Sequence, residues 1–255
     1  MKKIRLLLEY DGTDYQGWQI QKKGLTIQGM IEEGILKITE EHSRVIGASR
    51  TDAGVHALGQ VATFGTESRL NPKTIKNALN AVLPLNIRIL EASEADNSFN
   101  PREGVVKKSY FYIIENQKES SAFLHRYAWL VKQPLDLKSM TEAAEVLIGK
   151  HDFSSFKGTG SSTKNPVREV FSLSVEKLKK LDFMTANIIG EFIRIRIEAD
   201  GFLRHMARNI VGTLVEIGRG RILTDRMKDI LESCDRRLAG QTAPPNGLFL
   251  ERIVY

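Results

Sequence analysis

The sequence has little cysteine: Cys234 is the single one among 255 residues. One thiol cannot form an intramolecular disulfide, and it cannot build a cysteine-based zinc site. Cys234 follows Met227, Ile230 and Leu231 at helical spacing. We therefore expect it at a buried helix position rather than as a reactive thiol.

Long apolar runs are also missing. No stretch approaches the roughly 20 apolar residues that a membrane-spanning helix needs. The segment MKKIRLLLEYDG at 1–12 looks like the basic start of a signal peptide, but Arg5 and Glu9 interrupt an apolar run that is too short for one. We expect a cytoplasmic protein without membrane association.

Several familiar catalytic motifs are absent. The histidines are scattered, with no pair at metal-ligand spacing, and lie at His42, His56, His125, His151 and His205. The segment GTGSSTK at 158–164 lacks the glycine that precedes the lysine of a phosphate loop and the third glycine of a dinucleotide fingerprint. Neither a Gly-x-Ser-x-Gly elbow nor the zinc deaminase signature occurs. Hydride transfer, ATP hydrolysis and serine-type hydrolysis are therefore poorly supported.

What the sequence does have is a moderate excess of positive charge. Lys and Arg number 37 against 31 Asp and Glu, a net charge of +6, and 42% of the residues are hydrophobic. A globular protein of this length can form one large or two small domains. The charge favours a polyanionic partner over an acidic small molecule, although on charge alone lysines that only solvate the surface are the better explanation.

Periodicity predicts an α+β chain. Strand-like segments are 3–9, 44–48, 59–64, 87–91, 105–115, 127–131, 168–177, 183–189, 192–198 and 248–254. Helical segments are 26–41, one opened by Asn71-Pro72, then 136–148, 203–217 and 224–235. So few helices cannot cover both faces of a parallel sheet.

Two segments look alike, LLLEYDG at 6–12 and RIRIEADG at 194–201, and each precedes an amphipathic helix. The likeness fits a duplicated β–α unit. No linker of biased composition separates two halves, so we place a boundary near residue 105, with halves 1–105 and 106–255.

Four polar stretches could carry chemistry. Residues 47–60, GASRTDAGVHALGQ, set Arg50 and Asp52 among small residues, as either a structural turn or a ligand site would. KKSYFY at 107–112 is either an ordinary aromatic strand or a stacking surface for bases.

The other two stretches are rich in basic residues. The loop at 151–169 carries Lys157, Lys164 and Arg168, which suit a nucleic-acid backbone if the loop is not merely solvated. FLRHMARNIVG at 202–212 places Arg204 and Arg208 one turn apart on the expected helix.

Together these stretches resemble the tRNA pseudouridine synthase A (TruA) family. The motifs that carry the resemblance run in order through the chain: YDGTDYQGWQIQ at 10–21, SRTDAGVHALGQ at 49–60, FNPRE at 99–103, KKSYFY, HDFSSF at 151–156, RHMARNIVG at 204–212 and APPNGLFL at 243–250. One departure is Ser49, where bacterial members generally carry glycine; it bears on subgroup more than on chemistry.

The resemblance implies two α+β halves of ferredoxin-like topology that share a continuous, mainly antiparallel sheet, with a basic cleft between them. It implies a homodimer with tRNA lying across both subunits, and no cofactor or metal. The implied activity is isomerisation of uridine to pseudouridine in the anticodon stem-loop, at tRNA positions 38 to 40.

The resemblance also assigns residues. Asp52 matches the essential aspartate, and Arg208 matches the cation that keeps it ionised. Arg50 matches the side chain that enters the space left by the flipped nucleotide, and Tyr110 the tyrosine against the target base. We expect Arg50, Tyr110, His56, Lys164 and Arg168 to contact the substrate.

Two other functions stay open at this point. An inactive tRNA-binding protein on the same scaffold would be expected to lose the set Asp52, Tyr110 and Arg208, and all three are present. A hydrolase of nucleosides would need a second carboxylate, which Asp11, Asp14 or Asp200 could supply. Release of free uracil would identify a hydrolase.

Overall fold

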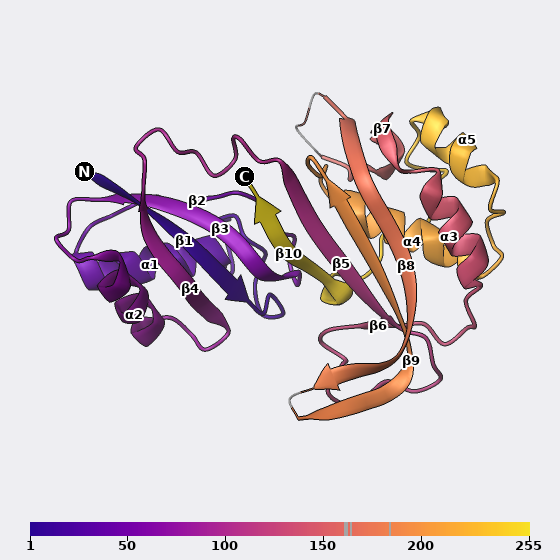
Figure 1. Cartoon of the computed structure of the whole chain (residues 1–255), viewed down its shortest axis with the longest axis horizontal. Helices are drawn as coiled ribbons and strands as arrows, with labels where there is room; N and C mark the ends of the chain where they lie inside the picture. Colours follow the sequence, from indigo (N-terminus) through magenta and orange to yellow (C-terminus); the bar gives the residue numbers. More distant parts are fainter. Residues whose placement is uncertain (161–162, 164, 184) are drawn as a thin grey trace. The chain divides into compact units, whose positions relative to one another are not determined.

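The computed structural model describes residues 1–160, 163, 165–183 and 185–255, which form two compact units (Figure 1). Unit 1 consists of Met1–Val106 and Phe249–Tyr255, and unit 2 consists of Lys107–Leu248. The strand at the end of the chain therefore belongs to unit 1, although all of unit 2 precedes it in the sequence.

Unit 1 has a β–α–β–β–α–β order. Its elements are β1 (Lys2–Tyr10), α1 (Ile27–Thr39), β2 (Ile46–Gly47), β3 (His56–Thr66), α2 (Pro72–Val82) and β4 (Ile87–Ala95), joined by β10 (Leu248–Val254). Strands β4, β1, β3 and β2 are neighbours in this order and all pair antiparallel, which is the ferredoxin-like arrangement. Strand β10 also pairs with β3, in parallel, through Phe249 with His56 and Leu250 with Ala57.

The sequence pattern explains the core of unit 1. Alternate residues of β1, namely Ile4, Leu6 and Leu8, are fully buried, as a strand with one covered face requires. The apolar stripe of α1 formed by Ile27, Ile31 and Ile35 is fully buried as well, and α1 packs beside α2 (Figure 1). Asn71 caps α2 by accepting a hydrogen bond from the backbone N–H of Thr74, with Pro72 at the first helical position, as predicted.

Unit 2 repeats part of this arrangement. Its strands are β5 (Lys107–Glu115), β6 (Trp129–Leu130), β7 (Gly149–Asp152), β8 (Val167–Phe183) and β9 (Ala186–Ala199), and its helices are α3 (Leu137–Glu145), α4 (Met206–Gly218) and α5 (Arg226–Ser233). Two short 3₁₀ turns are η1 (Ser154–Phe156) and η2 (Pro245–Gly247). Strands β5, β9, β8 and β7 pair antiparallel in this order, and β6 adds to β5 in parallel. The expected α+β class with a mainly antiparallel sheet is confirmed.

The sequence prediction was wrong about several element boundaries and about the burial of Cys234. Helix α4 begins at Met206 rather than 203, because His205 adopts a left-handed conformation (φ 60°), so Arg204 lies before the helix and not one turn from Arg208 on it. The expected strands at 183–189 and 192–198 are replaced by one strand, β9, and the short strand β7 was missed. Cys234 is exposed, because α5 ends at Ser233 and Cys234 forms its left-handed cap (φ 53°).

The likeness between 6–12 and 194–201 is not a repeat of equivalent elements. Strand β1 is the first strand of unit 1, whereas β9 is the third long strand of unit 2 after β5 and β8. Both segments nevertheless end in Asp-Gly, and in each the glycine lies against a stretch that the sequence analysis named. Gly12 lies against Val55 of the 47–60 stretch, and Gly201 lies against Arg168 of the 151–169 loop. Within the described residues, no helix has the length and apolar character needed to cross a membrane.

Candidate active site

Residues 47–55 of unit 1 lead from the last residue of β2 into β3 and carry Arg50 and Asp52; we call this segment the 47–55 loop. Arg50 is exposed and Asp52 is half-buried. The loop is anchored by Gln60, a fully buried side chain of β3, whose amide accepts from the N–H of Ser49 (3.2 Å) and donates to the carbonyl of Ser49 (2.8 Å). The N–H of Trp18 donates to the carbonyl of Thr51 (3.0 Å). These bonds fix the backbone on both sides of Arg50.

The glycines of the segment 10–18 let a second chain segment pack directly on this loop. A Cβ on Gly17, which has φ +89°, would lie 2.6 Å from the carbonyl oxygen of Thr51 and 2.9 Å from the carbonyl carbon of Asp52. A Cβ on Gly12 would lie 2.0 Å from the carbonyl oxygen of Val55. Side chains at these two positions would push the loop away, so the glycines determine where Asp52 sits.

His56 lies at the end of the loop and is 1% exposed. Its ring stacks on Phe249 of β10, with centroids 4.6 Å apart. Its Nδ1 lies 3.1 Å from the N–H of Gly12, which donates to it, and 3.1 Å from Oδ1 of Asp11. The imidazole thus ties β3, β10 and the Asp11-Gly12 step together beneath the loop.

In unit 2, β5 carries Tyr110 and Tyr112, and Arg208 lies in the first turn of α4. Tyr110 on β5 is 5% exposed and meets the ring of Phe202 edge-on, with centroids 4.7 Å apart. Tyr112 is fully buried and donates from its hydroxyl to the carbonyl of Pro244 (2.8 Å). Burial raises the pKa of Tyr112 well above its ordinary value, and the nearby charge of Arg208 only partly opposes this, so Tyr112 stays a neutral donor.

Arg208 is held at both its side chain and its backbone by the segment that follows α5. Its Nε donates to the carbonyl of Ala243 (2.7 Å), and the N–H of Ala243 donates to the carbonyl of Arg208 (3.1 Å). Sequence reasoning named Arg208 but not this anchor, although both residues lie in motifs that carried the resemblance.

Asn209, the next residue, was missed altogether. It is fully buried; its Nδ2 donates to the carbonyl of Phe156 (2.7 Å), and its Oδ1 accepts from Arg236 (3.0 Å) and from Thr242 (2.6 Å). A buried amide with all these partners satisfied fixes the turn of α4 that carries Arg208. An asparagine at an apolar-periodic position was the signal that could have revealed it.

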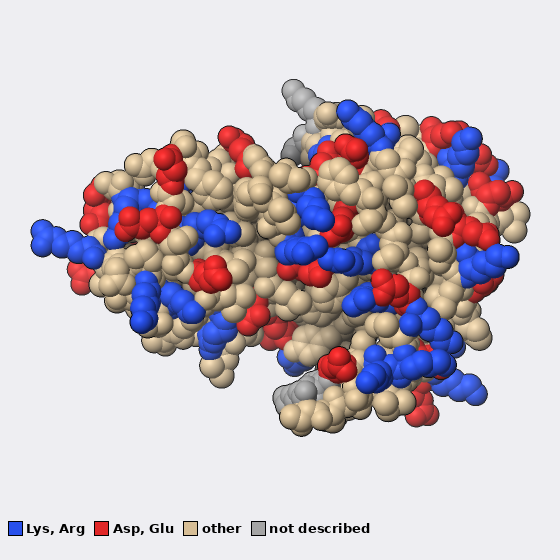
Figure 2. Space-filling model, viewed as in Figure 1, with Lys and Arg blue, Asp and Glu red and all other residues tan. Residues whose placement is uncertain are grey.

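The basic loop of unit 2 is only partly described. Arg168 on β8 donates from Nη1 to the carbonyls of Asn165 (3.0 Å) and Val167 (2.5 Å), and lies beside Gly201. Lys164 lies outside the described residues. Basic and acidic side chains alternate over the viewed face of each unit (Figure 2).

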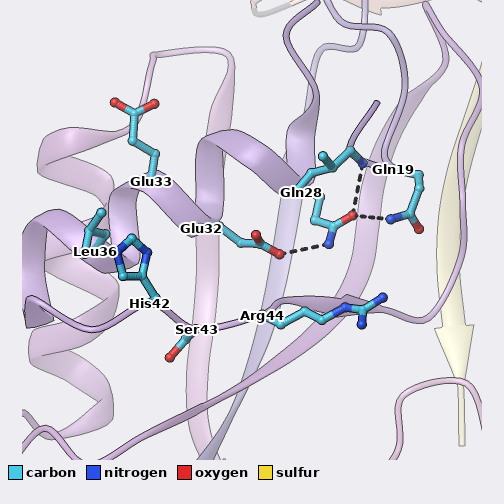
Figure 3. A pocket seen from close by; sticks show the side chains of 9 residues that line it. Gln19, Gln28, Glu32, Glu33, Leu36, His42, Ser43 and Arg44 are labelled. Atoms are coloured by element: carbon cyan, nitrogen blue, oxygen red, sulfur yellow. Dashed lines mark hydrogen bonds between the residues drawn. The ribbon is translucent and has the colours of Figure 1, made fainter. Parts of the chain in front are cut away.

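A hollow of about 670 Å³ lies elsewhere in unit 1, between α1 and residues 42–44 (Figure 3). Its polar groups bond to one another: Nε2 of Gln28 donates to Glu32 (2.8 Å), and Oε1 of Gln28 accepts from Gln19 (2.8 Å). The loop residues Arg50 and Asp52 do not line it. No group of three or more His, Cys, Asp or Glu side chains in the described part of the chain could hold a metal ion.

Comparisons with known proteins give one consistent family. A family described as tRNA pseudouridine synthase matches residues 7–102 and 143–255. The tRNA pseudouridine synthase A proteins of Thermodesulfovibrio yellowstonii and Thermoanaerobacter sp. are each 45% identical over all 255 residues and over their own full length. tRNA pseudouridine synthase A 2 of Clostridium perfringens is 42% identical with the same coverage. A chain from a solved Cbf5-Nop10-Gar1 complex aligns with a TM-score of 0.30 at 14% identity, covering 84% of this chain and 54% of that one, which is too distant to carry an argument.

Proposed function

Since the chain belongs to the tRNA pseudouridine synthase family, we propose that it is an isomerase that converts uridine to pseudouridine in tRNA. The observation that carries the proposal is the 45% identity to the synthases over the full length of the chain. By the family resemblance, the target uridines lie at positions 38 to 40 of the anticodon stem-loop.

The reaction breaks the bond between C1′ of the ribose and N1 of uracil, turns the base over, and joins C1′ to C5. C5 loses its hydrogen and N1 gains one, so atoms balance without a co-reactant. We assign Asp52 to the carboxylate beside C1′, where it either bonds to C1′ or takes a proton from the sugar. Both versions of the step need an ionised carboxylate.

We assign the remaining roles from the resemblance and from chemistry. Arg208 supplies the positive charge that keeps an aspartate ionised beneath a bound base. Its bond to Ala243 supports this role because it holds the guanidinium in one orientation. Tyr110 packs against the target base, and Arg50, exposed on the loop, enters the space that the flipped nucleotide leaves.

Roles for His56, Lys164 and Arg168 complete the assignment. Because His56 is buried beneath the loop, we propose that it acts by holding the loop rather than by touching RNA. Lys164 and Arg168 bind tRNA phosphates. We further propose that the protein works as a cytoplasmic homodimer with tRNA across both subunits. No observation favours an inactive tRNA-binding protein, because Asp52, Tyr110 and Arg208 are all kept.

Unmodified tRNA transcripts carrying tritium at C5 of uridine test the proposal. The protein should release tritium into water, and chemical mapping of the product should place pseudouridine at positions 38 to 40. Release of free uracil instead would identify a hydrolase. Tight tRNA binding without tritium release would identify an inactive binding protein.

A further inference from the structure

Three arginines of unit 1, Arg44, Arg50 and Arg102, gather around strand β2. Nε of Arg102 donates to the carbonyl of Gly47 (3.1 Å), and Gly47 lies three residues from Arg44 on one side and three from Arg50 on the other. All three side chains reach solvent. We call these three residues the arginine cluster.

The backbone between Arg44 and Arg50 is fixed. The N–H of Val45 donates to Glu32 (2.8 Å), the N–H of Ala48 donates to the carbonyl of Val61 (2.8 Å), and Ser49 is held by Gln60. Gly47 itself lies flat against Trp18, since a Cβ there would be 2.4 Å from the indole. The bases of the arginine side chains therefore have set positions, and the carbonyl that orients Arg102 cannot shift freely.

The cluster has no opposing charge. Among the described residues, no carboxylate forms an ion pair with any of the three arginines. Many other arginines of the chain do pair, as Arg194 does with Glu176 (2.7 Å) and Arg226 with Asp229 (2.7 Å). In Figure 3 the side chain of Arg44 extends away from Glu32 and Glu33.

The electrostatics agree with this geometry. The pKa of the Arg102 guanidinium lies below its ordinary value, first because the group is partly buried and then because Arg50 and Arg44 carry like charge nearby. Unpaired like charges repel one another, and a bound anion removes that repulsion. Guanidinium groups match the oxygens of phosphate in a two-pronged geometry.

We propose that Arg44 and Arg102 of the arginine cluster bind successive phosphates of the tRNA strand that leads to Arg50 and to the nucleotide at Asp52. The inference rests on the proposed function, and it adds Arg44 and Arg102 as residues that position the strand. The six residue-to-residue steps from Arg44 to Arg50 span at most about 20 Å, and a nucleic-acid strand carries one negative charge per nucleotide, so several phosphates can face the cluster. Asp52 follows Arg50 by two residues, which places the reacting nucleotide next to this strand.

The test compares Arg44→Gln and Arg102→Gln with Lys73→Gln, which removes one exposed positive charge from α2 of the same unit. Binding of an unmodified tRNA transcript is measured at several salt concentrations, and tritium release is measured across tRNA concentrations. We expect each arginine variant to weaken binding roughly fivefold. The slope of log K against log salt should fall by roughly 0.7 to 0.9 for each lost phosphate contact. The loss should appear mainly in KM, and Arg44→Lys should restore most of the affinity.

Arg44 makes no hydrogen bond within the described part of unit 1 that its loss would break, so Arg44→Gln should fold as the unaltered protein does. If its affinity and salt slope match those of Lys73→Gln while the unaltered protein releases tritium, the cluster is not a phosphate site and the proposed function still stands. If the unaltered protein releases no tritium, it is the proposed function that fails.

Discussion

At the scale of single residues, the groups that anchor the 47–55 loop differ from the carboxylate that is proposed to react. The bonds that fix it come from the amide of Gln60 and from backbone groups of Ser49, Thr51 and Trp18. None of these bonds uses the side chain of Asp52. An alteration of the carboxylate therefore leaves these particular bonds in place.

Replacing Asp52 by asparagine should abolish isomerisation while leaving tRNA binding nearly unchanged. Asparagine keeps the shape but removes the charge, and an amide is a poor nucleophile and a poor base. Binding depends mainly on phosphate contacts spread over a wide surface. The measurement is tritium release from C5-labelled tRNA at enzyme concentrations that saturate the RNA. Release at the unaltered rate would show that Asp52 is only a turn residue.

The sequence predicted residues of this site unevenly. Arg50 and Asp52 stand out in the sequence because charged residues among small ones are unusual. Their roles were assigned from the family resemblance of the motif at 49–60. The supports were harder to see, because Asn209, Gln60 and Ala243 act through contacts between residues far apart in the chain. A local pattern carries no information about such partners.

At the scale of elements, helical and strand periods predicted the middles of the elements well and their ends less well. The stripe of α1 and the alternation of β1 are set by burial of one face, which repeats over many residues. Ends depend on single residues, such as His205 and Cys234, which adopt left-handed conformations that no period reveals. The packing of segment 10–18 on the 47–55 loop likewise depends on two single residues, Gly12 and Gly17.

Gly17→Ala should disturb this packing much more than Gly104→Ala. Both glycines have positive φ (+89° and +67°), so each substitution carries a backbone penalty of about 1–2 kcal/mol. A Cβ at Gly104 meets nothing within 4 Å, whereas a Cβ at Gly17 meets the backbone of Thr51 and Asp52. We expect Gly17→Ala to lower the free energy of unfolding by about 1–3 kcal/mol more than Gly104→Ala, and to lose turnover.

Denaturant unfolding and tritium release measure the two effects. Equal losses of stability in the two variants would mean that the segments separate without cost, and that the glycines do not determine the position of the loop.

At the scale of the whole molecule, we assign catalysis to side chains of the protein and not to a bound metal ion. The histidines are dispersed over both units, and the described residues offer no cluster of metal ligands. The reaction needs a carboxylate and nearby cations rather than a Lewis acid.

Turnover should therefore survive exhaustive chelation. The tRNA transcript is folded and its structure is maintained with monovalent salt, so that loss of Mg²⁺ from the RNA does not confuse the result. Tritium release is then compared with and without EDTA. Loss of turnover in EDTA that zinc restores would contradict the assignment of catalysis to Asp52.

Strand β10 has a consequence for how the protein is made. Its residues from Phe249 pack in unit 1, where Phe249 stacks on His56 beneath the loop and Gly59 lets the carbonyl of Glu251 approach closely. A ribosome delivers these residues only after all of unit 2 has been synthesised. The nascent chain therefore contains Asp52 long before β10 is available to pack beside His56 and the 47–55 loop. Competence to modify RNA therefore begins only after unit 2 has been synthesised and β10 has packed against unit 1.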